Sequence, residues 1–358
     1  MSAKLHPSYL FFLVYMTQSG IIIFSLPRIT AETFGTNGWL AIPIVSLGVV
    51  FLISLYGCVY RWSNDKSLYS IIEEMLPKYS YKILYIFFSL FWTILAFTLT
   101  KNYVFLVKSL YYPLTNIHWL MLIMTMLIYF FVTSQISSIF KATVILFFLT
   151  AWMVLLPLGL LPDFELVRLT SFIFAFRSNL LEGSIQVYSA FLGFEIIFFF
   201  LHYVQRSAKT MKYIYLGHLY TTLVYLIVTF ISYGFTSFEH LITQSYPLID
   251  LFRYIELPFI ERLDGLYFMF FLMKIIVTAT LYLFVSIEMF QRSIQSIKAS
   301  YIPVLLCVIG FIGTYPLFTK YDIDFWLSNI VYVQTVISII LPVILILYLH
   351  VKRRKDDV

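Results

Sequence analysis

The sequence has few charged residues for its length, and this scarcity excludes most classes of protein. Only 12% of its 358 residues are charged, against about 25% in a soluble globular domain, and the mean hydropathy is +0.90. These values exclude a soluble enzyme, a disordered chain and a nucleic-acid-binding protein. The two cysteines, Cys58 and Cys307, both lie in apolar runs, which predicts packing rather than a redox or metal role.

Motifs of catalysis and metal binding are also missing. The sequence has no phosphate-binding loop, no nucleophile elbow and no cysteine pair, and its six histidines show no ligand spacing. We therefore expect no enzyme activity, no metal and no cofactor.

What the sequence has instead is a series of apolar runs that are long enough to span a bilayer, which takes roughly 20 residues. Because backbone groups in hydrocarbon must be satisfied internally, continuous apolar runs predict helices and not strands. We expect an all-α integral membrane protein, with 1–358 forming a single transmembrane domain. The ten predicted spans are 9–27, 39–60, 82–109, 118–134, 141–161, 184–204, 214–235, 263–290, 301–318 and 326–349.

The basic residues predict the orientation of this multi-pass protein. With cytoplasmic termini, the inner segments hold roughly twice as many Lys and Arg residues as the outer ones. The net charge of +6 therefore fits loops that face anionic headgroups better than it fits nucleic acid. The first span lacks a small-residue cleavage site, so we expect it to be retained. Residues 350–358 form a basic cytoplasmic tail.

Two spans at corresponding places in the chain are interrupted by polar and glycine residues. Spans one and six are each the first of five, and paired interruptions of this kind indicate an inverted-repeat transporter fold. We therefore expect a five-plus-five arrangement, with repeat one at about 9–161 and repeat two at about 184–349. Spans three and eight are the longest.

The interruptions supply the first candidate ligand-binding residues. Gln18, Ser19 and Gly20 lie in the middle of span one, and Ala190 and Gly193 lie in the middle of span six. A helix that unwinds there frees amide and carbonyl groups for a ligand, and the following half-helix favours an anion. The alternative for span one is a packing notch of small residues between helices.

Ionisable residues at membrane depth supply the others. Glu195 and Lys274 each lie about eleven residues into their spans, where a charge is costly and functional by default. We expect them to pair, directly or through water, with Thr278 one turn from Lys274 on the same face. The alternatives are a neutral Glu195 in a structural hydrogen bond and a Lys274 that faces a polar cavity alone.

Two loops have amphipathic patterns. Ser67 to Lys78 predicts a short surface helix on the inner side. The outer loop 236–262 carries an apolar stripe, and Glu261 and Asp264 flank the start of span eight. We interpret this loop as a lid or a partner surface with Glu261 and Asp264 as gate residues. A simple cap on the bundle is the alternative.

Several of these residues resemble the motifs of a known superfamily. Tyr188 to Glu195, which ends in Gly-Phe-Glu, resembles the sixth-helix motif of the amino acid–polyamine–organocation (APC) superfamily. Ser19-Gly20-Ile21 with Pro27 downstream resembles its first-helix break. The more specific segment, from Pro258 to Asp264, resembles the B subunit of spore germinant receptors, the GerAB-type spore germination proteins. The resemblance covers essentially the whole chain.

This resemblance implies a fold and a function. The fold is the LeuT/APC-like inverted repeat, with the ligand between helices one and six and with helices three and eight behind it. The function is that of a membrane subunit of a nutrient germinant receptor, which binds an amino acid or a similar small nutrient. The implied partners are an A-type membrane subunit and a C-type lipoprotein subunit in the cell membrane or spore inner membrane. In sodium-coupled relatives a cation lies between helices one and eight, and Lys274 could take its place. The alternative function is an amino-acid permease coupled to protons or cations.

Overall fold

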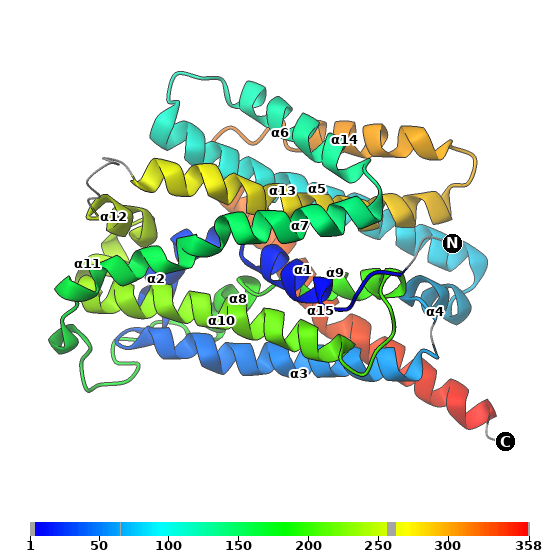
Figure 1. Ribbon diagram of the computed structural model, residues 1–358, viewed down its shortest axis with the longest axis horizontal. Coiled ribbons are helices and arrows are strands. Elements are labelled where there is room, and N and C mark those ends of the chain that lie inside the picture. Colours follow the sequence, from blue (N-terminus) through cyan, green and yellow to red (C-terminus); the bar gives the residue numbers. More distant parts are fainter. Residues whose placement is uncertain (1–3, 65, 256–262, 357–358) are drawn as a thin grey trace.

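The computed structural model describes residues 4–64, 66–255 and 263–356, which form a bundle of helices (Figure 1). By length and composition, seven of its helical segments could cross a membrane, and three further apolar helices are shorter. The seven are Gly38–Trp62, Lys78–Tyr111, Ile136–Asp163, Leu180–Tyr203, Thr210–Phe235, Leu263–Ser293 and Lys320–Arg354; the three are Tyr9–Gln18, Ile117–Val132 and Ala299–Gly313. Each of the ten overlaps one predicted span, which confirms the predicted all-α architecture.

The individual elements follow one another along the chain with short connections. In order they are α1 (Tyr9–Gln18), η1 (Ile21–Phe24), α2 (Leu26–Phe34), η2 (Gly38–Leu40), α3 (Ala41–Trp62), α4 (Leu68–Met75), α5 (Lys78–Tyr111), α6 (Ile117–Val132), α7 (Ile136–Ala151), η3 (Trp152–Asp163), η4 (Leu166–Arg168), α8 (Leu180–Ser189), α9 (Phe194–Ile197), η5 (Phe198–Tyr203), α10 (Thr210–Phe235), α11 (Phe238–Thr243), α12 (Pro247–Arg253), α13 (Leu263–Ser293), η6 (Ala299–Tyr301), α14 (Ile302–Gly313) and α15 (Lys320–Asp356).

Two of the three longest helices, α5 and α13, pack along each other (Figure 1). At 1.5 Å per residue, the 34 residues of α5 extend for about 50 Å. Tyr103 in α5 donates a hydrogen bond of 2.7 Å to the carbonyl of Phe268 in α13, and the Tyr103 ring stacks near that of Phe271. The pair therefore forms a fixed wall behind the interrupted helices.

The first and sixth spans are both broken where the sequence predicts it. Helix α1 ends at Gln18, residues 19–20 are not helical, and the chain continues as η1 and α2. Helix α8 ends at Ser189, residues 190–193 form a turn, and α9 begins at Phe194. Gly193 has a φ of 110°, a backbone conformation that a Cβ atom disfavours. The glycine is therefore what allows the chain to re-enter a helix after the turn.

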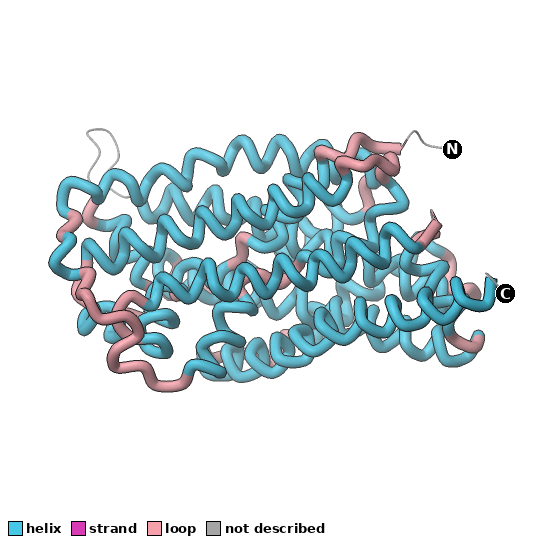
Figure 2. Tube along the Cα trace, turned by 90° about the horizontal axis from the view of Figure 1, so that it is seen from below, coloured by secondary structure: helices cyan, strands magenta, loops and turns pink. Residues whose placement is uncertain are grey.

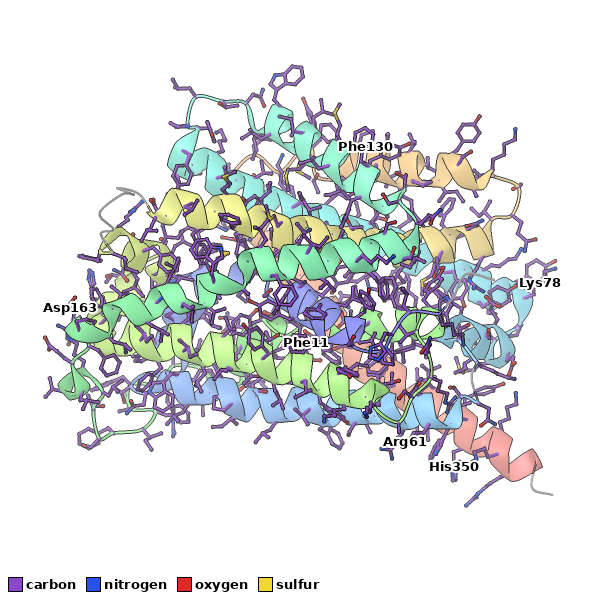
Figure 3. All side chains as sticks on the ribbon, viewed as in Figure 1. Phe11, Arg61, Lys78, Phe130, Asp163 and His350 are labelled. Carbon is purple, nitrogen blue, oxygen red and sulfur yellow. The ribbon has the colours of Figure 1, made fainter. Side chains whose placement is uncertain are left out.

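Both termini lie at the same end of the bundle (Figures 1 and 2). Arg61, Lys78 and His350 lie toward that end, and Asp163 lies at the other (Figure 3). An even number of crossings agrees with this placement. Within the described residues an isolated β-bridge joins Leu5 to Val204, and it ties the N-terminal segment to the end of η5.

The predicted inner surface helix is present as α4. The Ser67 side chain accepts a hydrogen bond from the backbone of Ser70 and so caps its N-terminus. Glu73 forms an ion pair of 3.0 Å with Arg292 of α13, and Glu74 forms one of 2.6 Å with Lys352 of α15. The helix therefore contacts two long helices at the end of the bundle where the termini lie (Figure 1).

The outer loop also contains helices, as its apolar stripe predicts. Helices α11 and α12 lie at the end of the bundle opposite the termini (Figure 1). In α12, Leu248 and Phe252 are buried against the bundle. The predicted gate residue Glu261 lies outside the described residues. The division of the chain into repeats at 9–161 and 184–349 remains a prediction.

Candidate functional site

The two helix breaks lie against each other, and Gln18 joins them. Its side-chain Nε2 donates a hydrogen bond of 2.7 Å to the carbonyl of Phe191 in the α8–α9 turn. Tyr225 of α10 adds a second link, because its hydroxyl contacts both the Gln18 carbonyl and, at 3.0 Å, the Ala190 carbonyl. Carbonyl groups that the breaks leave without helical partners are thus satisfied from across the junction.

A buried histidine extends this network away from the junction. His218 of α10 contacts the Gln18 amide at 3.2 Å through Nδ1 and the hydroxyl of Ser46 at 2.9 Å through Nε2. Ser46 of α3 lies 2.8 Å from the hydroxyl of Thr222. All of these contacts are neutral hydrogen bonds, so the chain from Gln18 to Thr222 holds α1, α3 and α10 in a fixed relation.

Glu195 is fully buried, and three neutral donors surround its carboxylate. The backbone N–H of Gly193 donates to Oε2 at 2.9 Å, and the hydroxyl of Tyr282 donates to Oε1 at 2.9 Å. The side-chain amide of Gln334 also donates to Oε1. Gln334 in turn accepts a hydrogen bond of 2.9 Å from the indole of Trp92. The carboxylate therefore links the α8–α9 break to α13, α15 and α5.

Lys274 has a different environment from the one that the sequence predicts. Its ammonium donates a hydrogen bond of 2.9 Å to the hydroxyl of Tyr15 and lies 4.7 Å from the centre of the same ring. The ring centre of Phe271 is 5.7 Å away. No ion pair joins Lys274 to Glu195, two residues that the structure describes, so the predicted direct pairing is wrong. Lys274 and Glu195 each contact their own set of partners. Which partners they reach depends on the rotation of each helix about its axis, and the sequence pattern does not define that rotation.

Thr278 joins α13 to the end of α1. Its hydroxyl lies 3.0 Å from the carbonyl of Met16 and 3.0 Å from that of Lys274 one turn earlier in α13. The predicted group of Lys274 and Thr278 therefore does face the first break. It does so at Tyr15 and Met16, the last turn of α1.

The remaining predicted residues differ in how much space surrounds them. The Ser19 hydroxyl is buried and lies next to the Tyr15 hydroxyl, one turn earlier in the chain. A Cβ atom added to Gly20 would have only the carbonyl oxygen of Gln18 within 4 Å, at 3.9 Å. At Gly193, in contrast, the Cβ atom would lie 3.0 Å from Thr17. The junction is therefore tightly packed at Gly193 and open at Gly20.

Aromatic rings cover the junction toward the end of the bundle opposite the termini. Phe24 of η1 stacks on Phe268 at 4.9 Å between ring centres and lies 5.7 Å from Tyr267. Phe252 of α12 contacts Tyr267 at 4.4 Å. Asp264 of α13 is the other predicted gate residue, and it is buried. Its carboxylate oxygen Oδ2 lies 3.8 Å from Nε of Arg253, which belongs to α12. Helix α12 is thus attached to α13 by both rings and charges.

Sequence reasoning missed several residues of this site. Tyr15, His218, Tyr225, Tyr282 and Gln334 were not among the candidates, although each makes a hydrogen bond to a predicted residue. Gln334 and His218 carried a usable signal, because both are polar side chains inside apolar runs. The sequence pattern carried no signal for the three tyrosines, because the chain has 28 tyrosines and nothing in the pattern distinguishes these from the others.

Comparisons of the sequence identify related proteins. The sequence model of the family described as "Spore germination protein" matches residues 4–323. The chain is 21% identical to spore germination protein GerQB of Bacillus cereus, over 73% of this chain and 72% of that protein. It is 24% identical to spore germination protein B2 of Bacillus subtilis (strain 168), over 70% and 69%. It is 25% identical to spore germination protein A2 of the same organism, over 75% of each.

A solved structure shares the fold. Mhp1, a nucleobase-cation-symport-1 family transporter in a closed conformation with bromovinylhydantoin bound, superposes with a TM-score of 0.62. The match covers 91% of this chain and 75% of Mhp1, at 14% sequence identity. At this identity the likeness concerns the fold alone, and it agrees with the broken first and sixth spans.

Proposed function

The chain belongs to the spore germination protein family, and from this premise we propose that it is the membrane subunit of a nutrient germinant receptor. We propose that it binds an amino acid or a similar small nutrient at the junction of the two helix breaks. The ligand-binding residues in this proposal are Gln18, Ser19, Gly20, Ala190, Gly193, Glu195, Lys274 and Thr278. Helices α11 and α12, with Asp264, act as the lid at the outer end.

One observation supports the proposal: two unwound segments meet inside the bundle, and side-chain hydrogen bonds join them. Irregular backbone at membrane depth is tolerated only where it is buried in protein or lines a cavity. The Gln18 amide and the Tyr225 hydroxyl donate hydrogen bonds to backbone carbonyls that the two breaks leave without helical partners. Such bonds can be exchanged for bonds to a ligand at little net cost, because each is a neutral hydrogen bond with a contribution of about 1 kcal/mol.

The proposal includes partners and a location. We propose that this subunit works beside an A-type membrane subunit and a C-type lipoprotein subunit, in the spore inner membrane, with both termini in the cytoplasm. The shared end of the termini and the basic residues toward it, such as Arg61 and Lys78, support this orientation.

A secondary transporter is the second candidate function, because Mhp1, which shares the fold, is a transporter. Receptor and transporter use the same fold, so the fold does not separate them. The two functions differ in whether the ligand crosses the membrane.

Binding and transport measurements on the purified full chain in nanodiscs and proteoliposomes test both functions. We expect at least one of the twenty proteinogenic L-amino acids to bind in nanodiscs, and none to accumulate in proteoliposomes. Uptake by the chain alone would favour the transporter, and the absence of binding to the whole panel would contradict an amino-acid ligand under either function. Gly20→Val should abolish binding by filling the open space at the break. Gly48→Val is the matched control, since a Cβ atom at Gly48 would have nothing within 4 Å.

A further inference from the structure

Two nitrogen-bearing side chains away from the junction have no hydrogen-bond partner among the described residues. Lys101 of α5 is fully buried, and its ammonium nitrogen Nζ has no acceptor in the described part of the chain. Both ring nitrogens of His118, in the first turn of α6, are likewise buried and unpartnered there. The charge of Lys101 acts on the His118 ring, so the two groups lie near each other. They therefore form one cluster of donors between α5 and α6.

The end of α14 brings these two side chains together. Lys101 lies one turn beyond Phe97 on the same face of α5, and a Cβ atom added to Gly310 of α14 would lie 2.3 Å from the Phe97 ring. The His118 ring stacks on Tyr315, which follows α14, at 4.0 Å between ring centres. This stacking holds the plane of the imidazole, so its N–H has a set direction.

The polar groups beside Lys101 have partners of their own. Asn102, the next residue of α5, accepts a hydrogen bond of 2.9 Å from Lys320. Lys320 also forms an ion pair of 2.7 Å with Asp324. That carboxylate therefore neutralises Lys320, and no described residue supplies a negative charge to Lys101. A buried ammonium without a counter-charge is strongly unfavourable at membrane depth.

An anion can approach this cluster from the end of the bundle opposite the termini. The loop that joins α5 to α6 lies toward that end (Figure 1). Its residues Tyr112 and Leu114 are exposed, and His118 is partly exposed although its ring nitrogens are buried. The path to Lys101 therefore leads past the His118 ring.

We propose that Lys101 and His118 bind a small inorganic anion such as chloride. Lys101 gives the anion a charge-assisted hydrogen bond, and the imidazole supplies a neutral N–H donor in either tautomer. Because protein encloses the donor nitrogens, the site admits a single-atom ion rather than an amino acid or a phosphate. The ion provides the counter-charge of Lys101 and ties α5 to α6. It lies apart from the junction, so the inference holds for a receptor and for a transporter alike.

A chloride titration tests this inference on the unaltered protein. The purified full chain in detergent is unfolded by heat in sodium gluconate, and sodium chloride replaces the gluconate stepwise at constant ionic strength. We expect the unfolding midpoint to rise with the chloride concentration and then to saturate, because an ion that binds only the folded state stabilises it by mass action. Gluconate serves as the reference anion, since it is too large for an enclosed site.

Variants test the same assignment from the protein side. Lys101→Met should weaken the apparent chloride affinity roughly 10- to 100-fold, as for the loss of a hydrogen bond to a charged group, and Lys101→Arg should restore part of it. His118→Phe keeps a ring to stack on Tyr315 but removes both nitrogens, and it should weaken the affinity by roughly 10-fold. The matched control is Lys108→Met, which removes one positive charge from α5 two turns farther on, where Lys108 is partly exposed. Its chloride response should be that of the unaltered chain.

Each outcome supports or overturns the anion site. A midpoint of the unaltered chain that does not change with chloride overturns it, and Lys101 is then a buried neutral amine. An equal chloride response in Lys101→Met and in the unaltered chain also overturns it, because the response then has another origin. Should Lys101→Met fail to fold, the titration of the unaltered chain and of His118→Phe still decides. None of these results bears on amino-acid binding at the junction, so the proposed function is tested separately.

Discussion

Substitution of the glycine in the α8–α9 turn should be costly, and the structure allows the cost to be worked out. Gly193 has a φ of 110°, in the region that residues with a side chain rarely adopt. Holding such a residue there costs about 1–3 kcal/mol. In Gly193→Ala the new Cβ atom would also lie 3.0 Å from the Thr17 Cβ and 3.2 Å from the Thr17 carbonyl oxygen. Thr17 is buried in the last turn of α1, so the two breaks would have to separate to relieve the contact.

The glycine of the other break provides the matched comparison. Gly20 has a φ of −87°, and a Cβ atom there would touch nothing closer than 3.9 Å. Replacing such a glycine by alanine stabilises a protein by about 0.4–1 kcal/mol, because the unfolded chain loses freedom. Gly20→Ala should therefore be neutral or slightly stabilising, while Gly193→Ala should lose about 2–3 kcal/mol.

Thermal unfolding of the purified variants in one detergent measures this difference. The unfolding midpoint of Gly193→Ala should fall clearly below that of the unaltered protein, and that of Gly20→Ala should stay level or rise. Equal shifts in the two variants, or an unchanged midpoint in Gly193→Ala, would refute the argument from backbone conformation and contact.

Three further predictions concern the polar contacts. The effects of Glu195→Gln and Lys274→Met on stability should add, to within about 0.5 kcal/mol, because the two residues have separate partners; a large coupling in the double variant would mean that they interact after all. Gln18→Leu should lower the free energy of unfolding by about 1–3 kcal/mol, because it leaves buried acceptors unpaired; a midpoint as high as that of the unaltered protein would contradict this. The hydrogen bond from Lys352 lowers the pKa of Glu74. The ion pair is therefore fully formed above the ordinary carboxyl pKa of about 4.3, and it is lost as the pH falls through the lowered pKa of Glu74. Spin labels on α4 and the end of α15 should therefore report a broad distance distribution in acid but not at neutral pH, and Glu74→Gln should be broad at both.

The helix breaks could be predicted because their cause is local. Ser19-Gly20 and Gly193 are poor helix positions within runs that are otherwise strongly apolar, and residues of this kind at mid-span favour an interruption of the helix. The surface helix α4 could be predicted for the same reason, since its cap Ser67 and its apolar stripe lie in adjacent residues. Each of these features depends on one stretch of chain.

The partners of the buried charges could not be predicted, because they depend on helix rotation. Lys274 was expected to reach Glu195, yet it lies two turns of α13 before Tyr282, the residue of that helix that does bond to Glu195. Two turns of a helix extend for about 11 Å. Helix α13 can therefore contact the first break through Lys274 and the second break through Tyr282 at separate points along its length. A sequence pattern shows that both residues are costly at membrane depth, but it does not show which neighbour satisfies each.

Receptor and transporter place different demands on the seals at the two ends of this junction. At the end of the bundle that holds the termini, a backbone bridge joins Leu5 to Val204 and the rings of Phe198 to Phe200 are buried. Toward the opposite end, Tyr267 contacts the rings of both Phe24 and Phe252. A transporter must open each seal in turn, whereas a receptor needs its ligand only to favour one arrangement over another by differential affinity. A ligand bound at the proposed junction would act on η1 and α13, which carry Phe24 and Tyr267 of the rings at the end opposite the termini. It would also act on α9, which continues into η5 at the other end. A receptor requires the ligand to move the first set of rings while the Leu5–Val204 bridge stays in place, whereas a transporter requires both ends to open in turn.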